Sequence, residues 1–253
     1  MGRVSSFFGA LLRRDASGRS WLPGLLAATP HAPQRLGGLV AEPGWLVTPL
    51  AVATANGELG AFTYSATPAR ELLSWYFEHP DALVWPPGAR MSAATTRLRR
   101  ALIDDDPPGA RARAQERARE LIRVRSPFSR EWWRFEETAR LDCVLVTDRL
   151  VVTVRGLEAG SIPPATDWYP RRSQLVADLE ASRLLSGERQ WASLLISDHP
   201  LTVDDENHLA QAIDAGAPHL DAVGRDELRA SFLGNITWRT AADAVDLPLE
   251  TPA

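Results

Sequence analysis

The chain contains no lysine, because all 28 of its basic residues are arginine. Any mechanism that needs a lysine amine is therefore excluded. The bias toward arginine is also what a GC-rich genome produces, as are the many alanines, prolines and glycines. The sequence has neither a glycine-rich phosphate loop nor a G-x-S-x-G nucleophile motif, and these absences narrow the range of enzyme classes.

Cysteine is almost absent as well. The single cysteine, Cys143, lies in an apolar stretch, which excludes a disulfide framework and a cysteine-rich zinc site. The five histidines are scattered without the i, i+4 or paired spacing that zinc ligands require. We therefore expect no zinc centre, and a reducing cytoplasm is the expected location.

Long hydrophobic runs are missing. The apolar run near the N-terminus is short, is closed by Arg13 and Arg14, and is followed by no small-residue cleavage site. It predicts neither a signal peptide nor a membrane span, and no later stretch is long and apolar enough to cross a bilayer. We expect no membrane association.

The composition is that of an ordinary globular protein. A chain of 253 residues with 45% hydrophobic and 24% charged residues can bury one sizeable core or two small ones. The net charge of -4 gives no overall attraction to nucleic acid, so any such binding must come from a local patch.

The strongest break in the sequence is IDDDPPGAR, where three acids and two prolines must end any helix. It predicts a linker at residues 103–110, after an N-terminal region, 1–102. In that region, residues 70–78 have helical spacing of apolar residues, and residues 44–64 suggest a short strand pair.

After the linker the pattern becomes regular. It predicts a core at residues 111–216, followed by a helical tail at 217–253 whose last residues are disordered. The predicted core elements are a helix (111–124), three strands (132–136, 140–146 and 150–155), a helix beginning near Pro170 and running to about 185, a strand (191–196) and a helix (203–215). This α-β-β-β-α-β order predicts an α/β protein in which helices flank a small mixed sheet.

That order, with Asp142 opening the second strand, resembles the PD-(D/E)XK nuclease superfamily. Four segments are similar to those of an uncharacterised bacterial family with this core: WYFEHPDALVWP (75–86), REWWRFEE (130–137), TDWYPRRSQL (166–175) and SFLGNITW (231–238). The resemblance implies a site in which an Asp on the second strand and a Glu on the third bind Mg²⁺, while a nearby Lys positions the attacking water. Carboxylate oxygens suit this hard cation.

In this chain Asp142 matches the first acid, but Arg155-Gly156-Leu157 stands where Glu-x-Lys is expected. A guanidinium puts positive charge where the cation would lie, and leucine cannot position water. The sequence therefore predicts a degenerate site without a cofactor, in which Asp142 is a half-buried acid paired with Arg155 across the hairpin. If a metal binds, Asp142 is its expected ligand.

The alternative is a site rebuilt from other acids that binds Mg²⁺ or Mn²⁺. Glu158 lies one residue past the altered triad, and Glu136 and Glu137 lie just before Asp142. Residues 155 and 157 share one face of a strand, so residue 158 points the other way unless a turn intervenes. An acid from the preceding helix, Glu116 or Glu120, is another source of a ligand.

Two further features bear on binding. Gln174 resembles a glutamine that points at the catalytic centre or the DNA backbone in related nucleases, and residues 111–134 hold eight arginines against three glutamates. Arginines near aromatic residues bind phosphates and stack on bases. Solvated helix faces are the alternative interpretation of both features. The predicted nucleic-acid contacts are Arg119, Arg123, Arg171 and Arg172.

The function predicted from the sequence is that of a degenerate PD-(D/E)XK nuclease-like protein that has lost metal-dependent phosphodiester hydrolysis. It would act as a nucleic-acid-binding or regulatory module. One alternative is an active Mg²⁺- or Mn²⁺-dependent endonuclease with a rearranged site at Asp142, Glu158 and Glu136 or Glu137. Another is a protein-interaction domain that does not bind DNA or RNA.

Overall fold

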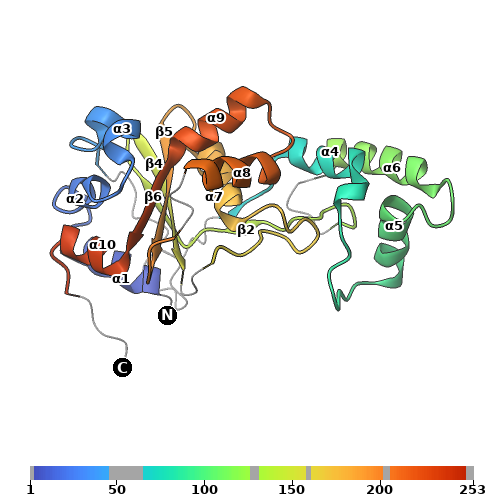
Figure 1. Ribbon diagram of the computed structural model, residues 1–253, viewed down its shortest axis with the longest axis horizontal. Coiled ribbons are helices and arrows are strands. Elements are labelled where there is room, and N and C mark those ends of the chain that lie inside the picture. Colours follow the sequence, from blue (N-terminus) through green and yellow to red (C-terminus); the bar gives the residue numbers. More distant parts are fainter. Residues whose placement is uncertain (1–2, 46–64, 126–130, 158–160, 202–205, 249–253) are drawn as a thin grey trace.

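The computed structural model describes residues 3–45, 65–125, 131–157, 161–201 and 206–248. Helices cover both faces of a central four-stranded sheet, and a further group of helices, α4 to α6, lies at one end of the molecule (Figure 1). The predicted class, α/β with a small mixed sheet flanked by helices, is confirmed.

The sheet has the strand order β3-β4-β5-β6. Strand β3 runs antiparallel to β4 across a tight turn, whereas β4, β5 and β6 are parallel. Parallel neighbours need crossover connections, which α7 supplies between β4 and β5, and α8 and α9 between β5 and β6. The strands are β3 (Cys143–Val146), β4 (Leu150–Leu157), β5 (Gln190–Ser197) and β6 (Phe232–Thr237).

Apolar side chains pack on both faces of this sheet. On one face, Leu157, Leu195 and Phe232 form a cluster with α7 (Gln174–Ser186), α8 (Glu206–Gly216) and α9 (Ala222–Ser231). The other face carries the largest cluster, formed with α1 (Arg3–Arg14), α2 (Leu22–Ala27) and α10 (Trp238–Ala244). Next to β6, the amide of His31 donates to the carbonyl of Leu233, just before α3 (Ala32–Leu36) and the short helix η1 (Gly37–Leu39).

A separate aromatic cluster holds the helices at the far end together. It contains Tyr76, Phe77, Trp132, Trp133 and Phe135, with apolar residues of three helices. These helices are α4 (Arg70–Glu78), α5 (Ala93–Ile103) and α6 (Ala110–Val124), and the short helix η2 (Pro80–Ala82) follows α4. Helix α6 was expected to lie on the sheet, but it packs against α4 and α5 instead (Figure 1).

The strand predicted at residues 132–136 is not formed. Every side chain in that segment is buried, so it lacks the alternation of a strand with one solvent-exposed face. It is an irregular segment packed under α4 to α6. The chain becomes extended only at β2 (Ala139–Arg140), which pairs antiparallel with β1 (Ser65–Ala66) in a separate two-stranded sheet.

The tail predicted to be helical contains a strand, β6, that completes the sheet. Gly234, with φ of 103°, and the buried Asn235 interrupt its apolar sequence. The pairing of β6 with β5 shifts register at this point. Glycine and a polar residue inside a strand mark such a bulge, and they hide the strand from a search for continuous apolar runs.

The other predicted boundaries differ by a few residues. Helix α7 begins at Gln174 rather than near Pro170, because Ser173 caps it by accepting a hydrogen bond from the amide of Val176. Most of the strand pair expected at 44–64, and the start of the helix expected at 203, lie outside the described residues.

Gly156 marks a close contact between β4 and α1, and substitution should show it. A Cβ there would overlap Val4 Cγ2 and lie 3.0 Å from Trp238 Cζ2. We expect Gly156→Ala to lower the free energy of unfolding by about 1–3 kcal/mol, because α1 must shift. Chemical denaturation measures this loss.

Gly38→Ala is the matched control, since a Cβ on Gly38 would meet nothing within 4 Å. Val4→Ala should be less costly in the Gly156→Ala background than in the wild-type protein. A Gly156→Ala variant as stable as the wild type would contradict the overlap.

Candidate functional site

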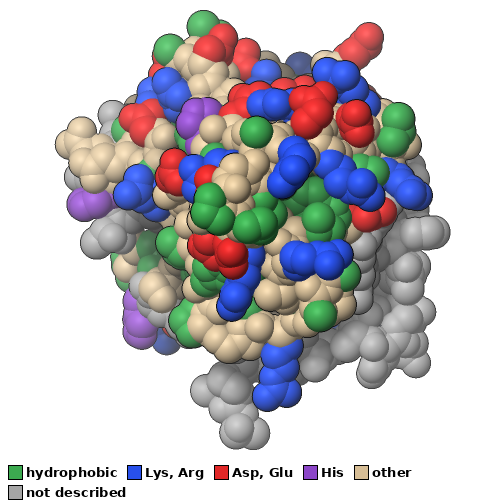
Figure 2. All heavy atoms as spheres, turned by 90° about the vertical axis from the view of Figure 1, so that its right-hand side faces the viewer, with side chains coloured by type: hydrophobic (Ala, Val, Ile, Leu, Met, Phe, Trp, Pro, Cys, Tyr) green, Lys and Arg blue, Asp and Glu red, His purple; other side chains and the backbone are tan. Residues whose placement is uncertain are grey.

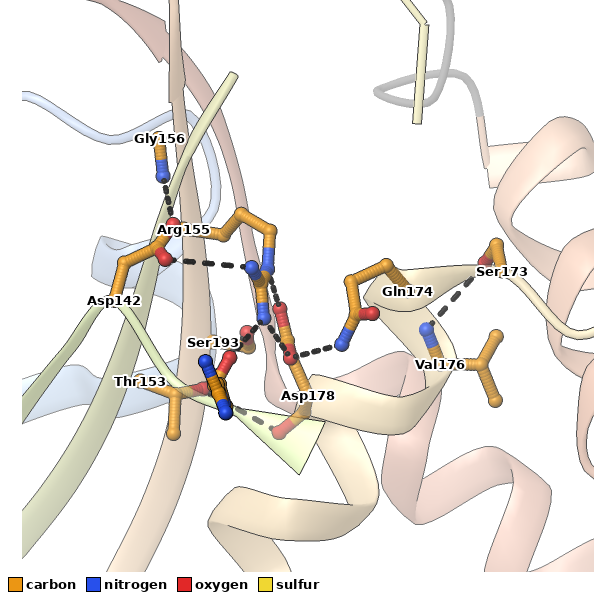
Figure 3. A network of polar contacts seen from close by, with 10 residues as sticks. Asp142, Thr153, Arg155, Gly156, Ser173, Gln174, Val176, Asp178 and Ser193 are labelled. Atoms are coloured by element: carbon orange, nitrogen blue, oxygen red, sulfur yellow. Dashed lines mark hydrogen bonds and ion pairs between the residues drawn. The ribbon is translucent and has the colours of Figure 1, made fainter. Parts of the chain in front are cut away.

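The candidate site lies at the carboxyl end of β4. Asp142 directly precedes β3, and Arg155 lies on β4 beside it; Gln174 and Asp178 come from the first two turns of α7 (Figure 3). In open α/β sheets, ligands bind at the carboxyl ends of the strands. The position of these four residues is therefore one at which binding sites commonly occur.

The Arg155 guanidinium is the centre of this group. Its Nε lies 2.5 Å from Asp178 Oδ2 and its Nη2 lies 2.8 Å from Asp178 Oδ1, so the pair is bidentate. Nη2 also donates to the carbonyl of Arg140 at 2.8 Å, and Nη1 lies 3.5 Å from Asp142 Oδ1. The predicted Asp142–Arg155 pair is present, but Asp178, to which no role was assigned, is the main partner of Arg155.

The two carboxylates differ in their surroundings. The side chain of Asp142 is 35% exposed, and its Oδ2 accepts a hydrogen bond from the amide of Gly156 at 3.1 Å. The side chain of Asp178 is only 2% exposed, and its Oδ1 also accepts from Gln174 Nε2 at 3.0 Å. Gln174 does point into the candidate site, where it binds the buried acid.

The electrostatics follow from burial and pairing. Burial by itself lowers the pKa of Arg155, but the hydrogen bonds and charge of Asp178, together with the charge of Asp142, raise it above its ordinary value. Burial raises the pKa of Asp178, and the hydrogen bonds from Arg155 act against that rise. Without Arg155, nothing of comparable strength would stabilise the buried carboxylate.

The other acids considered for a rebuilt site lie elsewhere or outside the described residues. The carboxylate of Glu136 is bound by Arg172 at 2.7 Å and by the hydroxyl of Tyr76 at 3.1 Å. Glu137 is exposed, as are Glu116 and Glu120 on α6. Glu158 belongs to residues 158–160, which are not described.

Leu157, at the position of the expected lysine, is buried in the apolar cluster with α7, α8 and α9. Among the described residues, no three His, Cys, Asp or Glu side chains form a group that could hold a metal ion.

The structure corrects one of the four predicted nucleic-acid contacts. Arg172 is 1% exposed and cannot reach a ligand at the surface. Its Nε pairs with Glu136 and its Nη2 with Glu180 at 2.5 Å, while its Nη1 donates to the carbonyl of Gly216 at 2.9 Å. A charged residue at the start of an apolar stripe was assigned to the surface, but its partners bury it.

Arg119, Arg123 and Arg171 do reach solvent. Arg119 lies 3.5 Å from Glu116 on the same helix. Arg119 and Arg123 belong to α6, at the far end of the molecule from the helices on the sheet (Figure 1). Only Arg171 lies near the start of α7.

The Arg172 cluster was not foreseen. Besides Glu136 and Tyr76 it contains Glu180 and His219, whose Nε2 lies 2.7 Å from Glu180 Oε1. Burial raises the pKa of Glu180, but the charge of Arg172 and the hydrogen bond from His219 outweigh burial and lower it to about 2. The available signal was Glu180 itself, an acid in a helix whose other positions are mostly apolar.

No family model, curated protein or solved structure matches this chain. None of the described helices is both long enough and apolar enough to span a membrane.

The Arg155–Asp178 pair should be costly to break from one side. Arg155→Met leaves a buried carboxylate without its counterion, so we expect the free energy of unfolding to fall by about 3–5 kcal/mol. The double variant Arg155→Met/Asp178→Leu should recover much of this loss, because it removes both charges. Urea denaturation of the two single variants and the double variant measures the coupling.

Arg171→Met is the control, since it removes an exposed arginine nearby and should change stability by no more than about 0.5 kcal/mol. Equal losses for Arg155→Met and the double variant would contradict the pairing.

Glu180 should make stability depend on acid pH. Its pKa is lowered from 4.5 to about 2, so its contribution is fully present above pH 4.5 and is lost as the pH falls toward 2. We expect the stability advantage of the wild type over Glu180→Gln to shrink across this range by on the order of 3 kcal/mol. Denaturation at a series of pH values tests this.

Glu137→Gln is the control, because it removes one negative charge from an exposed side chain. An advantage over Glu180→Gln that stayed constant down to pH 2 would show that Arg172 does not stabilise the ionised carboxylate.

Proposed function

We propose that this protein is a nuclease-like protein that has lost metal-dependent phosphodiester hydrolysis and acts as a binding or regulatory module. The observation that carries the proposal is the position of the Arg155 guanidinium, which is bound by Asp178 and contacts Asp142. A cation belonging to the protein thus occupies the place between the carboxylates.

Two physical arguments support this function. First, a divalent ion at Asp142 and Asp178 would have to displace a guanidinium held by two hydrogen bonds to one carboxylate and one to the carbonyl of Arg140. Second, hydrolysis needs a group that positions or deprotonates water. Leu157 is packed against α7 to α9, and the chain has no lysine to take that role.

The same proposal extends to the partner and the compartment. Because the site charges are paired internally, binding would use other surfaces, with nucleic acid or another protein as the partner. The single cysteine, Cys143, is fully buried in β3 and suits a reducing cytoplasm.

Metal and cleavage assays test the proposal. We expect no cleavage of plasmid or single-stranded DNA with Mg²⁺ or Mn²⁺ by the wild type or by Asp142→Ala. We also expect neither ion to raise the Tm of the wild type, since a ligand that binds only the folded state stabilises it by mass action. Calorimetry with increasing metal concentration measures this.

Arg155→Ala is the informative comparison, because it removes the guanidinium that contacts both carboxylates. Mn²⁺ should raise the Tm of Arg155→Ala but not that of the wild type. Cleavage by the wild type that disappears in Asp142→Ala would overturn the proposal in favour of an active endonuclease with a rearranged site. Glu158→Ala would then show whether Glu158 belongs to that site.

A further inference from the structure

The two neighbouring helices α5 and α6 carry arginines that are free to bind. Residues 93–124 contain eight arginines and five acids, a net charge of +3 in a protein whose total is -4. Three of these arginines are engaged, by carbonyl groups or by an acid: Arg99, Arg111 and Arg119. The other five are exposed, and their side chains have no ion pair or hydrogen bond within the described part of the chain: Arg97, Arg100, Arg113, Arg117 and Arg123.

These five arginines, the free arginine face, are positioned by the packing of the two helices. Helix α6 buries Ala114, Ala118 and Ile122, which leaves Arg113 and Arg117 one turn apart on its outer side, about 6 Å along the axis. Helix α5 buries Arg99 and Leu102 and leaves Arg97 and Arg100 outside. Figure 2, which views this end of the molecule, shows arginine side chains spread over the surface among acidic and apolar ones.

Most acids of these two helices and of the turn between them accept a hydrogen bond or form an ion pair. Asp104 accepts a hydrogen bond from the indole of Trp85, and Asp105 accepts from the amides of Gly109 and Arg111 in the turn between the helices. Glu116 pairs with Arg119. Asp106 and Glu120 are the acids whose side chains have no partner within the described part of the chain. With every acid counted, residues 93–124 still carry three more positive than negative charges.

The chemistry of the face favours phosphate over a protein surface. The guanidinium fork matches phosphate oxygens in a bidentate arrangement, and a nucleic-acid strand presents a regular row of phosphates. Protein interfaces are usually built around buried apolar and aromatic anchors. On α5 and α6, Val124 is the only large apolar side chain that is strongly exposed among the described residues, at 78%.

We infer that the free arginine face of α5 and α6 binds the phosphate backbone of a nucleic acid. This inference rests on the proposed function, because it gives the binding module its partner. It places the contact on helices outside the sheet, and not at Asp142 and Arg155. Because the proposed contacts are to phosphates and not to bases, DNA and RNA are both candidates.

Binding should be measured by fluorescence anisotropy with single-stranded DNA, duplex DNA and RNA of one sequence, in EDTA at several salt concentrations. The variant Arg113→Glu/Arg117→Glu alters the free arginine face. The control Arg13→Glu/Arg239→Glu changes the net charge equally, at two exposed arginines of α1 and α10. Thermal melting checks that both variants are folded.

We expect the wild type to bind at least one of the three nucleic acids at low salt. Arg113→Glu/Arg117→Glu should weaken that binding by about tenfold or more. The fall of log K with log salt should become shallower, its slope reduced in magnitude by about 1.4–1.8, as expected for two lost phosphate contacts. The control should retain most of the affinity. Polyglutamate, which has carboxylates and no phosphates, should compete poorly.

Three results would overturn the inference: no binding by the wild type at low salt, equal weakening by both double variants, or competition by polyglutamate as strong as that of unlabelled nucleic acid. The proposed function fails by a different result, cleavage that depends on Asp142. Because EDTA prevents metal-dependent cleavage, the binding result is independent of that outcome.

Discussion

The buried ion cluster around Arg172 is the interaction on which the rest of this structure depends. Its guanidinium joins Glu136, from the irregular segment under α4 to α6, to Glu180 on α7. Tyr76 of α4 donates to the same Glu136, and His219 reaches Glu180 from the loop before α9. A buried charge left without its partner is strongly destabilising, so these groups must come together in one arrangement. The aromatic helices are thereby fixed to the sheet.

The same cluster determines where the candidate site can form. Arg172 lies two residues before α7, so its contacts fix the start of that helix against the sheet. Gln174 and Asp178 then face β4, and Asp178 meets Arg155. The resemblance to nucleases implies a carboxylate at position 155. With a guanidinium there, Asp178 on the facing helix serves as its counterion.

The parts of the fold that sequence could predict are those set by local pattern. Strands β4 and β5 are apolar runs bounded by turn residues, and the hairpin register brings Asp142 beside Arg155. The misses have tertiary causes. Arg172 looks like a surface residue because its partners come from distant segments. Strand β6 is interrupted by a bulge, and Trp132 and Trp133 look like strand residues although they pack beneath helices.

Three groups of the described arginines differ in the carboxylates within their reach. Arg172 has two buried acids and becomes part of the core. Arg155 pairs with one buried and one half-exposed acid and lies between them in the candidate site. On α5 and α6 most acids are held by Trp85, by backbone amides or by Arg119, which leaves the remaining arginines without partners. The proposed capacity to bind an external anion therefore lies where the protein supplies more unpaired arginines than unpaired carboxylates, on helices that are separate from the candidate site at Asp142 and Arg155.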